Sequence, residues 1–255
     1  MKSLARCARS GSKGNDLTPR DLLQAGKLDE AIDALSAELR DNPTDVRRRT
    51  FLFELLCFAG KYDRAEKQLD VVGQGSKEAE MGALLYHSAL HAERLRQGMF
   101  ETGGFPLTSP PKPVSGTLNG KPFQSLTDAD PRIGARLELF AAGQYTWIPF
   151  EHIESMQMLP PKRLRDMLWA PAIVRTAESF RGMELGEVIV PAIAPLTWRH
   201  ADGAVRLGRV TQWQPLDDDS EAPIGQKLFL VDDEEFPILE LRELTIASPL
   251  LSVAD

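Results

Sequence analysis

A 34-residue repeat near the start of the chain constrains the fold more than any other sequence feature. Gly26–Ile32 reads GKLDEAI, and the segment that begins 34 residues later, Gly60–Glu66, reads GKYDRAE. Leucine and alanine positions on both sides match at the same offset. A period of this length, with Ala-Gly at the end of one helix and Ala inside the next, is typical of tetratricopeptide repeats. The first part of the chain is therefore predicted to stack pairs of antiparallel helices.

The spacing of apolar residues extends this helical prediction along the first hundred residues. Helices are predicted at 16–25, 28–39, 46–59, 62–72 and 78–96. The third of these is apolar on nearly all sides, which is typical of a helix buried between neighbours. Glycines and prolines follow from Gly98 onward and end the pattern. We therefore predict a flexible tail at 1–15, a helical domain at 16–97 and a linker loop at 98–127.

The second half of the chain has the pattern of short strands separated by turns. Leu137–Phe140 and Tyr145–Ile148 flank Ala142-Gly143, which is the composition of a hairpin. Further strands are predicted at 187–190, 205–213, 227–231 and 238–246, and a brief helix at 160–169. Residues 128–255 are thus expected to form a small, mostly antiparallel β domain, for which a partly closed barrel is one arrangement. The predicted fold class is α+β in two parts, a tetratricopeptide-like α-solenoid followed by this β domain.

Charge and cysteine content exclude several classes of protein. The net charge is −7, and the acidity belongs to the second half, since residues 1–100 carry 16 basic and 15 acidic side chains and the remainder carries 14 and 22. This balance argues against a nucleic-acid-binding surface, which needs a positive field. No apolar run approaches the ~20 residues that a membrane-spanning helix needs. The two cysteines favour a reducing cytoplasm over a disulfide framework.

The first helix of each repeat should line the concave wall of the helical array, where such arrays bind partners. Counting from the repeated glycines, the predicted partner-binding residues are Arg20, Gln24, Arg47, Thr50, Glu54, Phe58, Leu84, Ser88 and His91. Polar side chains around an apolar centre suit an amphipathic helix or an extended peptide. The alternative is that Phe58 and Leu84 only pack against the array's own helices. A general co-chaperone for acidic peptides is a further reading, although Glu54 offsets the positive charge of Arg20 and Arg47.

Two pairs of residues raise the alternative of a metal-dependent enzyme. His87 and His91 lie four residues apart, so they share a helix face and could hold a metal with a third ligand. Asp128 and Asp130 have the spacing of a cation loop but lack the further oxygen ligands of a calcium site, and turn formation explains them more simply. No nucleophile elbow or phosphate-binding loop is present. We therefore predict no catalytic residue, no cofactor and no metal, with an enzyme built from these two pairs as the alternative.

The second half also carries a series of motifs rich in tryptophan, proline and glycine. They are Asp128–Gly134 (DADPRIG), Tyr145–Phe150 (YTWIPF), Arg165–Ala172 (RDMLWAPA), Val190-Pro191, Arg206–Trp213 (RLGRVTQW) and Gly225-Gln226. In this order they resemble the C-terminal domain of the ImpE/TagJ family, which are accessory proteins of the bacterial type VI secretion system. Together with the helical repeats, the resemblance covers residues 17–250.

This resemblance implies a non-enzymatic cytoplasmic adaptor whose partners are proteins. Members of the family bind the small subunit of the contractile sheath through a helix near the N-terminus of that subunit. They are thought to assist the AAA+ unfoldase that recycles the contracted sheath. We therefore expect these two partners for the present chain, and neither nucleic acid nor membrane.

Overall fold

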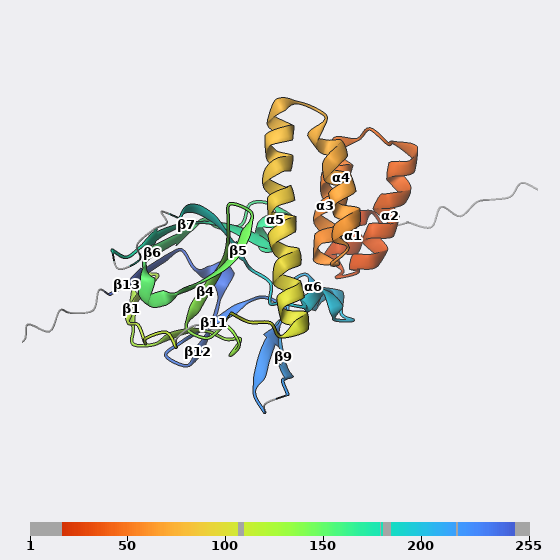
Figure 1. The fold of residues 1–255 in the computed structure, drawn as a ribbon. Coiled ribbons are helices and arrows are strands. Elements are labelled where there is room, and N and C mark those ends of the chain that lie inside the picture. The colour runs from red at the N-terminus through yellow and green to blue at the C-terminus, as the bar shows by residue number, and fades with distance from the viewer. Residues whose placement is uncertain (1–16, 107–109, 179, 181–184, 218, 248–255) are drawn as a thin grey trace, which may run out of the picture.

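A computed structural model of the chain has a helical half and a β half that lie side by side (Figure 1). It describes residues 17–106, 110–178, 180, 185–217 and 219–247, so the predicted tail at 1–15 lies outside the described residues. No helix in this part of the chain combines the length and the apolar character needed to cross a membrane. The two-part α+β organisation expected from the sequence is confirmed.

The helical half consists of the five helices that the periodicity predicts. They are α1 (Pro19–Gln24), α2 (Leu28–Asp41), α3 (Val46–Phe58), α4 (Tyr62–Gly73) and α5 (Lys77–Thr102). Side-chain caps fix three of the starts, because the side chains of Thr18, Asp45 and Ser76 each accept a hydrogen bond from a backbone N–H in the first helical turn. Between paired helices, Gly26 and Gly60 adopt φ values of 76° and 65°, a left-handed conformation that glycine adopts without strain.

The β half is built around an eight-stranded antiparallel sheet with the strand order β2-β1-β13-β6-β7-β8-β4-β5. Its strands are β1 (Gly116–Leu118), β2 (Lys121–Phe123), β4 (Arg136–Ala141), β5 (Gln144–Pro149), β6 (Ile153–Met158), β7 (Trp169–Thr176), β8 (Gly186–Pro191) and β13 (Glu243–Ile246). A three-stranded sheet contains β3 (Leu126–Asp128), β11 (Leu228–Val231) and β12 (Glu234–Pro237). The described strands of the large sheet end at β2 and β5, so they form no closed barrel.

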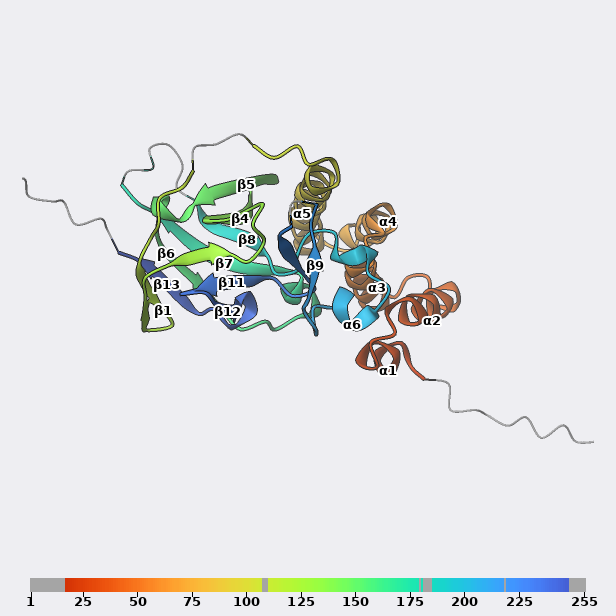
Figure 2. The same cartoon turned by 90° about the horizontal axis from the view of Figure 1, so that it is seen from below.

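Smaller elements connect these sheets. A two-stranded hairpin, β9 (Gln212–Pro215) and β10 (Glu221–Ile224), projects from the body (Figure 1). The single-turn helix α6 (Gly203–Arg206) lies against the helical half, close to α2 and α3 (Figure 2). Four 3₁₀ turns complete the part of the chain that the structure describes: η1 (Phe150–His152), η2 (Leu164–Met167), η3 (Thr197–Arg199) and η4 (Ile238–Glu240).

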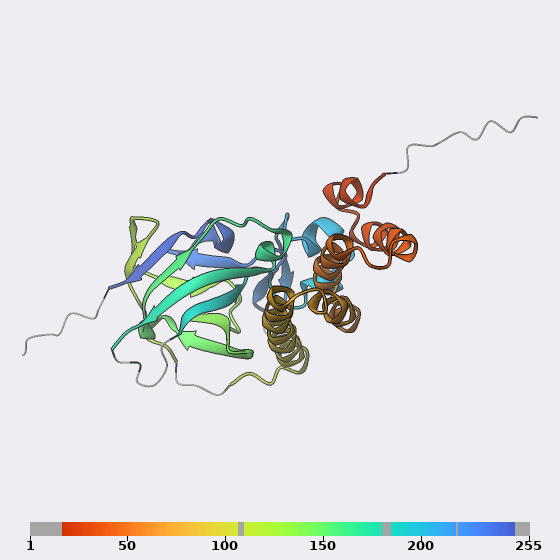
Figure 3. The same ribbon diagram turned by 90° about the horizontal axis from the view of Figure 1, so that it is seen from above.

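Two buried clusters form the core, and one of them belongs to both halves. The first lies within the β half and includes Phe150 and Phe229, whose rings meet edge to face with centroids 5.6 Å apart. The second contains the apolar faces of α2, α3 and α4 together with Phe140, Trp169 and Ile193 of the β half. Viewed from above, α5 stands between the sheet and the other helices (Figure 3). The two halves are thus parts of one packed body.

Several predicted boundaries are wrong. The linker loop at 98–127 is shorter than expected, because α5 continues to Thr102 and β1, β2 and β3 occupy much of the rest. Where a strand was expected at 205–213, the Asp202 side chain accepts a hydrogen bond from the Ala204 N–H and starts α6 instead. The strand expected at 238–246 divides into η4 and β13, and the helix at 160–169 is only the turn η2. Strands β6 and β7 were not predicted.

Candidate functional site

The concave wall predicted for the helical half is partly filled by the chain's own β half. Glu54 and Phe58 are both buried, with Phe58 only 2% exposed. The Arg165 guanidinium, carried by η2, donates a 3.0 Å hydrogen bond from Nη1 to Glu54 Oε1 and lies 4.7 Å from the centroid of the Tyr86 ring. Burial raises the pKa of Glu54, although the charge of Arg165 opposes this. The expectation that Glu54 and Phe58 face an open groove is therefore wrong.

The other seven predicted wall residues do not share one surface. Arg20, Gln24, Arg47, Leu84 and His91 are exposed, while Thr50 and Ser88 are half-buried. Leu84 lines a shallow depression beside His87 and Asp70, on the α4 side of α5. Ser88 instead lines a separate groove beside the sheet. A role for these seven residues in partner binding stays a prediction.

The two residue pairs of the enzyme alternative do not converge. His87 Nε2 lies 3.2 Å from Asp70 Oδ1, and His87 Nδ1 lies 3.7 Å from Glu66 Oε1. His91 is exposed, whereas Asp128 and Asp130 are buried in the β half. Among the described residues, no group of three His, Cys, Asp or Glu side chains has an arrangement that could hold a metal ion.

A buried ionic network joins α5 to the sheet, and no motif in the sequence predicted it. Arg96 of α5 is 1% exposed. Its Nε and Nη2 atoms donate hydrogen bonds of 2.7 Å each to the two carboxylate oxygens of Glu138 on β4. Nη1 donates to Glu93 Oε1 at 3.1 Å, and Nη2 also donates to the Ile193 carbonyl at 2.9 Å. A bidentate arginine–carboxylate pair of this kind fixes orientation as well as distance.

Lys227 extends the network into the β half. Its ammonium contacts the carboxylates of both Asp128 and Glu138. Burial alone would raise the pKa of Glu138, but the charges of Arg96 and Lys227 outweigh burial and lower this pKa to about 2. Burial raises the pKa of Asp128 to about 7, against the attraction of Lys227. The network therefore contains two cationic side chains, Arg96 and Lys227, and three carboxyl groups, those of Glu93, Glu138 and Asp128.

Further hydrogen bonds fix α5 against the β half. Glu93 Oε2 accepts a 3.0 Å hydrogen bond from Trp169 Nε1 on β7. Gln97 Oε1 accepts hydrogen bonds from the Leu196 backbone N–H at 2.9 Å and from Trp198 Nε1 at 3.2 Å. Glu93, Gln97 and Trp169 are buried, and these hydrogen bonds satisfy their polar atoms, which favours a single geometry of the interface.

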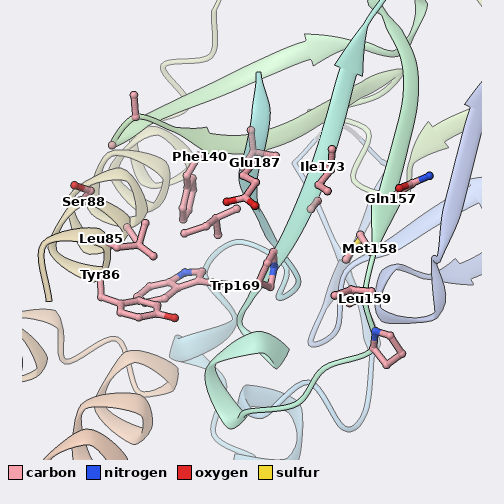
Figure 4. A pocket seen from close by; sticks show the side chains of 18 of the residues that line it. Leu85, Tyr86, Ser88, Phe140, Gln157, Met158, Leu159, Trp169, Ile173 and Glu187 are labelled. Atoms are coloured by element: carbon pink, nitrogen blue, oxygen red, sulfur yellow. The ribbon is translucent and has the colours of Figure 1, made fainter. Parts of the chain in front are cut away.

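A large apolar groove runs between α5 and the outer face of the eight-stranded sheet, and we call it the α5–sheet groove (Figure 4). Its volume is about 770 Å³. The apolar lining includes Leu85, Tyr86, Ala89, Phe140, Met158, Leu159, Trp169, Ile173 and Ile189, and the polar lining is Ser88, Gln157, Glu187, Arg242 and Glu243. Figure 4 shows Leu85 and Tyr86 on the α5 side and Ile173 on the strand side.

The groove exists because the two faces of the sheet have different partners. Along β7, Ala172 and Val174 point into the β core, while Pro171 and Ile173 are exposed on the opposite face. The second half of α5 covers this outer face at β4, through Arg96 and Glu138. The first half of α5 covers Trp169 through Tyr86 but leaves Pro171 and Ile173 of β7 exposed. Only the packing of α5 determines this arrangement, so the alternation of β7 alone could not have revealed it.

Comparisons with known proteins agree with both halves. Residues 120–245 match the family model described as ImpE protein, and residues 22–85 match a tetratricopeptide repeat model. The type VI secretion system accessory component TagJ of Pseudomonas aeruginosa is 33% identical over 258 residues, covering 88% of this chain and 89% of the relative. The crystal structure of protein VPA1032 from Vibrio parahaemolyticus has the same fold, with a TM-score of 0.78 and 22% identity over 91% of this chain and 98% of that one.

Proposed function

Since this chain belongs to the ImpE family, we propose that it is a non-catalytic cytoplasmic adaptor of a bacterial type VI secretion system. The observation that carries the proposal is the similarity to an accessory component of such a system along nearly the whole length of both proteins. Because that similarity includes the helical repeats and the β half together, it supports a shared role for the complete body.

The partner that we propose is a helix near the N-terminus of the small sheath subunit, and the process is recycling of the sheath by the AAA+ unfoldase. Tetratricopeptide arrays and apolar grooves both recognise helical segments through side-chain contacts. The chain offers exposed apolar side chains beside a preformed groove, which supports this kind of binding. The buried, mutually paired charges around Arg96 and Lys227 support a structural role for the most perturbed ionisable groups.

Binding of sheath-subunit peptides tests this function. Fluorescein-labelled overlapping peptides of the small sheath subunit from the same bacterium are titrated with the full-length chain, and binding is followed by fluorescence anisotropy. We expect saturable binding of the peptide that covers the N-terminal helix. A peptide of the same composition in scrambled order is the control and should not bind. Absence of binding by every peptide and by the intact subunit would contradict the proposal.

A further inference from the structure

We propose that the α5–sheet groove receives the partner as an amphipathic α-helix whose basic flank lies along Glu187 and Glu243. The inference rests on the proposed function and adds the binding surface and the chemistry of the segment that it takes. It also moves the site away from the concave wall, where Glu54 and Phe58 are already covered.

Exposed apolar side chains gather at this groove. Leu85 on α5 and Ile173 on β7 are 53% and 45% exposed, and both line it. Leu159 lines the end of the groove near β6, and Met81 lies one turn before Leu85 on the same face of α5; both are highly exposed. Contiguous apolar surface of this kind on a folded monomer marks an interaction site, since its exposure to water is unfavourable.

The strand pairing at the floor favours a helix over an extended peptide. Strand β7 is hydrogen-bonded to β6 on one side and to β8 on the other. The free edges of the sheet are β2 and β5, and neither forms this floor. An extended peptide laid over β7 would therefore find no backbone partners there, whereas a helix satisfies its own backbone groups and offers an apolar stripe.

The charges of the lining select a basic segment. Glu187 and Glu243 are exposed, and neither side chain forms an ion pair with another described residue. Arg242 is the remaining charged lining residue, and its Nη1 donates hydrogen bonds to the carbonyls of Leu239 and Leu241 at 2.8 and 2.6 Å. The lining thus has one excess negative charge, and lysine or arginine on one flank of the helix complements it.

The groove is also preformed. Bidentate pairing of Arg96 with Glu138, together with the bond from Trp169 to Glu93, holds α5 at a fixed position against the sheet. A groove that does not need to assemble avoids part of the ordering cost of binding. A docked helix would then gain from burial of the apolar surface already presented at Leu85 and Ile173.

Matched substitutions in the full-length chain test the position of the site. The probe is the fluorescein-labelled peptide that covers the N-terminal helix of the small sheath subunit. Leu85→Glu and Ile173→Glu should each raise its Kd at least about tenfold, because a charge enters the apolar contact. Leu95→Glu, on the same helix, and Val210→Glu are the controls. Leu95 and Val210 are similarly exposed, 45% and 44%, but lie outside the groove, and their variants should stay within about twofold of the wild type.

A charge exchange tests the chemistry of the flank. The double variant Glu187→Lys/Glu243→Lys should bind the sheath-subunit peptide more weakly than the wild type does. It should bind more tightly a version of that peptide in which the flanking lysines and arginines are replaced by glutamate. This reversal of preference requires direct electrostatic contact, and a loss of folding could not produce it. The exposed Glu221, outside the groove, provides the control Glu221→Lys, which should leave the preference unchanged.

The outcomes separate this inference from the proposed function. If the peptide binds the wild type and all four single variants with equal affinity, the proposed function is supported, but the α5–sheet groove is not the binding site. If neither the sheath-subunit peptides nor the intact subunit binds the wild type, the proposed function and the inference about the groove are both wrong. If sedimentation shows that Leu85→Glu dissociates a wild-type dimer while peptide affinity is unchanged, a second copy of the chain occupies the groove, and the inference is overturned.

Discussion

Arg94 and Arg96 lie two residues apart on α5 and have very different surroundings. Arg94 pairs at the surface with Asp63 and Glu66, at 3.0 and 2.7 Å. Arg96 is buried between the two halves and forms ion pairs with Glu138 and Glu93. Surface ion pairs contribute little to stability, whereas removal of one partner from a buried pair leaves an uncompensated charge in a medium that solvates it poorly.

We therefore expect the two arginines to differ strongly in alanine substitution. Arg96→Ala should lower the free energy of unfolding by about 3–5 kcal/mol, because Glu138 and Glu93 lose their buried partner. Arg94→Ala, the matched control, should lower it by less than about 1 kcal/mol. Urea denaturation of both variants gives the comparison. Equal effects of the two substitutions would contradict a stabilising role for the buried network.

Asp128 should make stability depend on pH in the neutral range. Its folded-state pKa of about 7 lies above the ordinary value of 3.8, so between these values the folded protein binds more protons than the unfolded chain. The contribution of Asp128 to the free energy of unfolding should therefore fall as pH rises through this window. Asn cannot ionise, so Asp128→Asn should remove this component of the decline between about pH 5 and 7.

Urea unfolding at several pH values measures this difference. Glu138 should not obscure it, because its pKa of about 2 lies below the window. Asp63→Asn is the control, since that carboxylate is exposed at the surface, and its profile should run parallel to the wild type. If the Asp128→Asn profile were also parallel to the wild type, the protonation of Asp128 would play no part.

At the scale of elements, the two repeat glycines perform the same local task in different surroundings. Both lie between paired helices at positive φ. The backbone N–H of the next residue, Lys27 or Lys61, donates a 2.9 Å hydrogen bond to the carbonyl of Leu22 or Leu56, respectively. A Cβ added at Gly26 would make an ordinary 3.6 Å contact with the Ala204 backbone nitrogen. A Cβ added at Gly60 would lie 2.5 Å from the Trp198 ring.

The two glycine-to-alanine substitutions should separate these effects. Gly26→Ala should lower the free energy of unfolding by roughly 1–2 kcal/mol, the cost of an L-residue in the left-handed conformation. Gly60→Ala should cost about 1–3 kcal/mol more, because the new methyl group overlaps the indole of Trp198. Thermal and urea unfolding of the two variants test the difference. Equal losses would mean that η3 moves aside without cost.

The helix α5 shows how an element boundary depends on its surroundings. The sequence predicts an end near Arg96, since Gly98 weakens helix formation. In the structure α5 continues past Gly98, and Phe100 is buried with its ring 5.1 Å from that of Phe105. The helix ends at Gly103, which has φ of 67°. Tertiary packing of the last turns therefore outweighs the local cost of one glycine.

At the scale of the whole molecule, the shared core ties the stability of the two halves together. Trp169 of β7 lies in the same buried cluster as Phe53 of α3 and stacks with Tyr86 of α5, at a centroid distance of 6.3 Å. On the far side of the helical half, Arg209 Nη1 donates a 2.8 Å hydrogen bond to the Gln24 carbonyl. Neither half can open without exposing apolar surface of the other.

We therefore expect one cooperative unfolding transition. The four tryptophans, Trp147, Trp169, Trp198 and Trp213, are carried by the β half, so their fluorescence reports on the β half and, through Trp169 and Trp198, on its contacts with the helices. Circular dichroism at the helical minimum reports mainly on α1 to α5. The two urea curves should coincide, as a two-state transition requires. Loss of the helical signal at a lower urea concentration than the fluorescence signal would show that the halves unfold separately.

The sequence alone determined the repeat, the positions of five helices, the mostly antiparallel β half and the family resemblance. These depend on local spacing, turn residues and motifs, which are written in short stretches of chain. The sequence did not determine which surface of the folded chain remains accessible to a partner. Glu54 is covered by Arg165, which is 111 residues away, and the α5–sheet groove joins one helix to strands from five separate segments. Only the tertiary structure decides such features, because periodicity shows that a face is apolar but cannot show what packs against it.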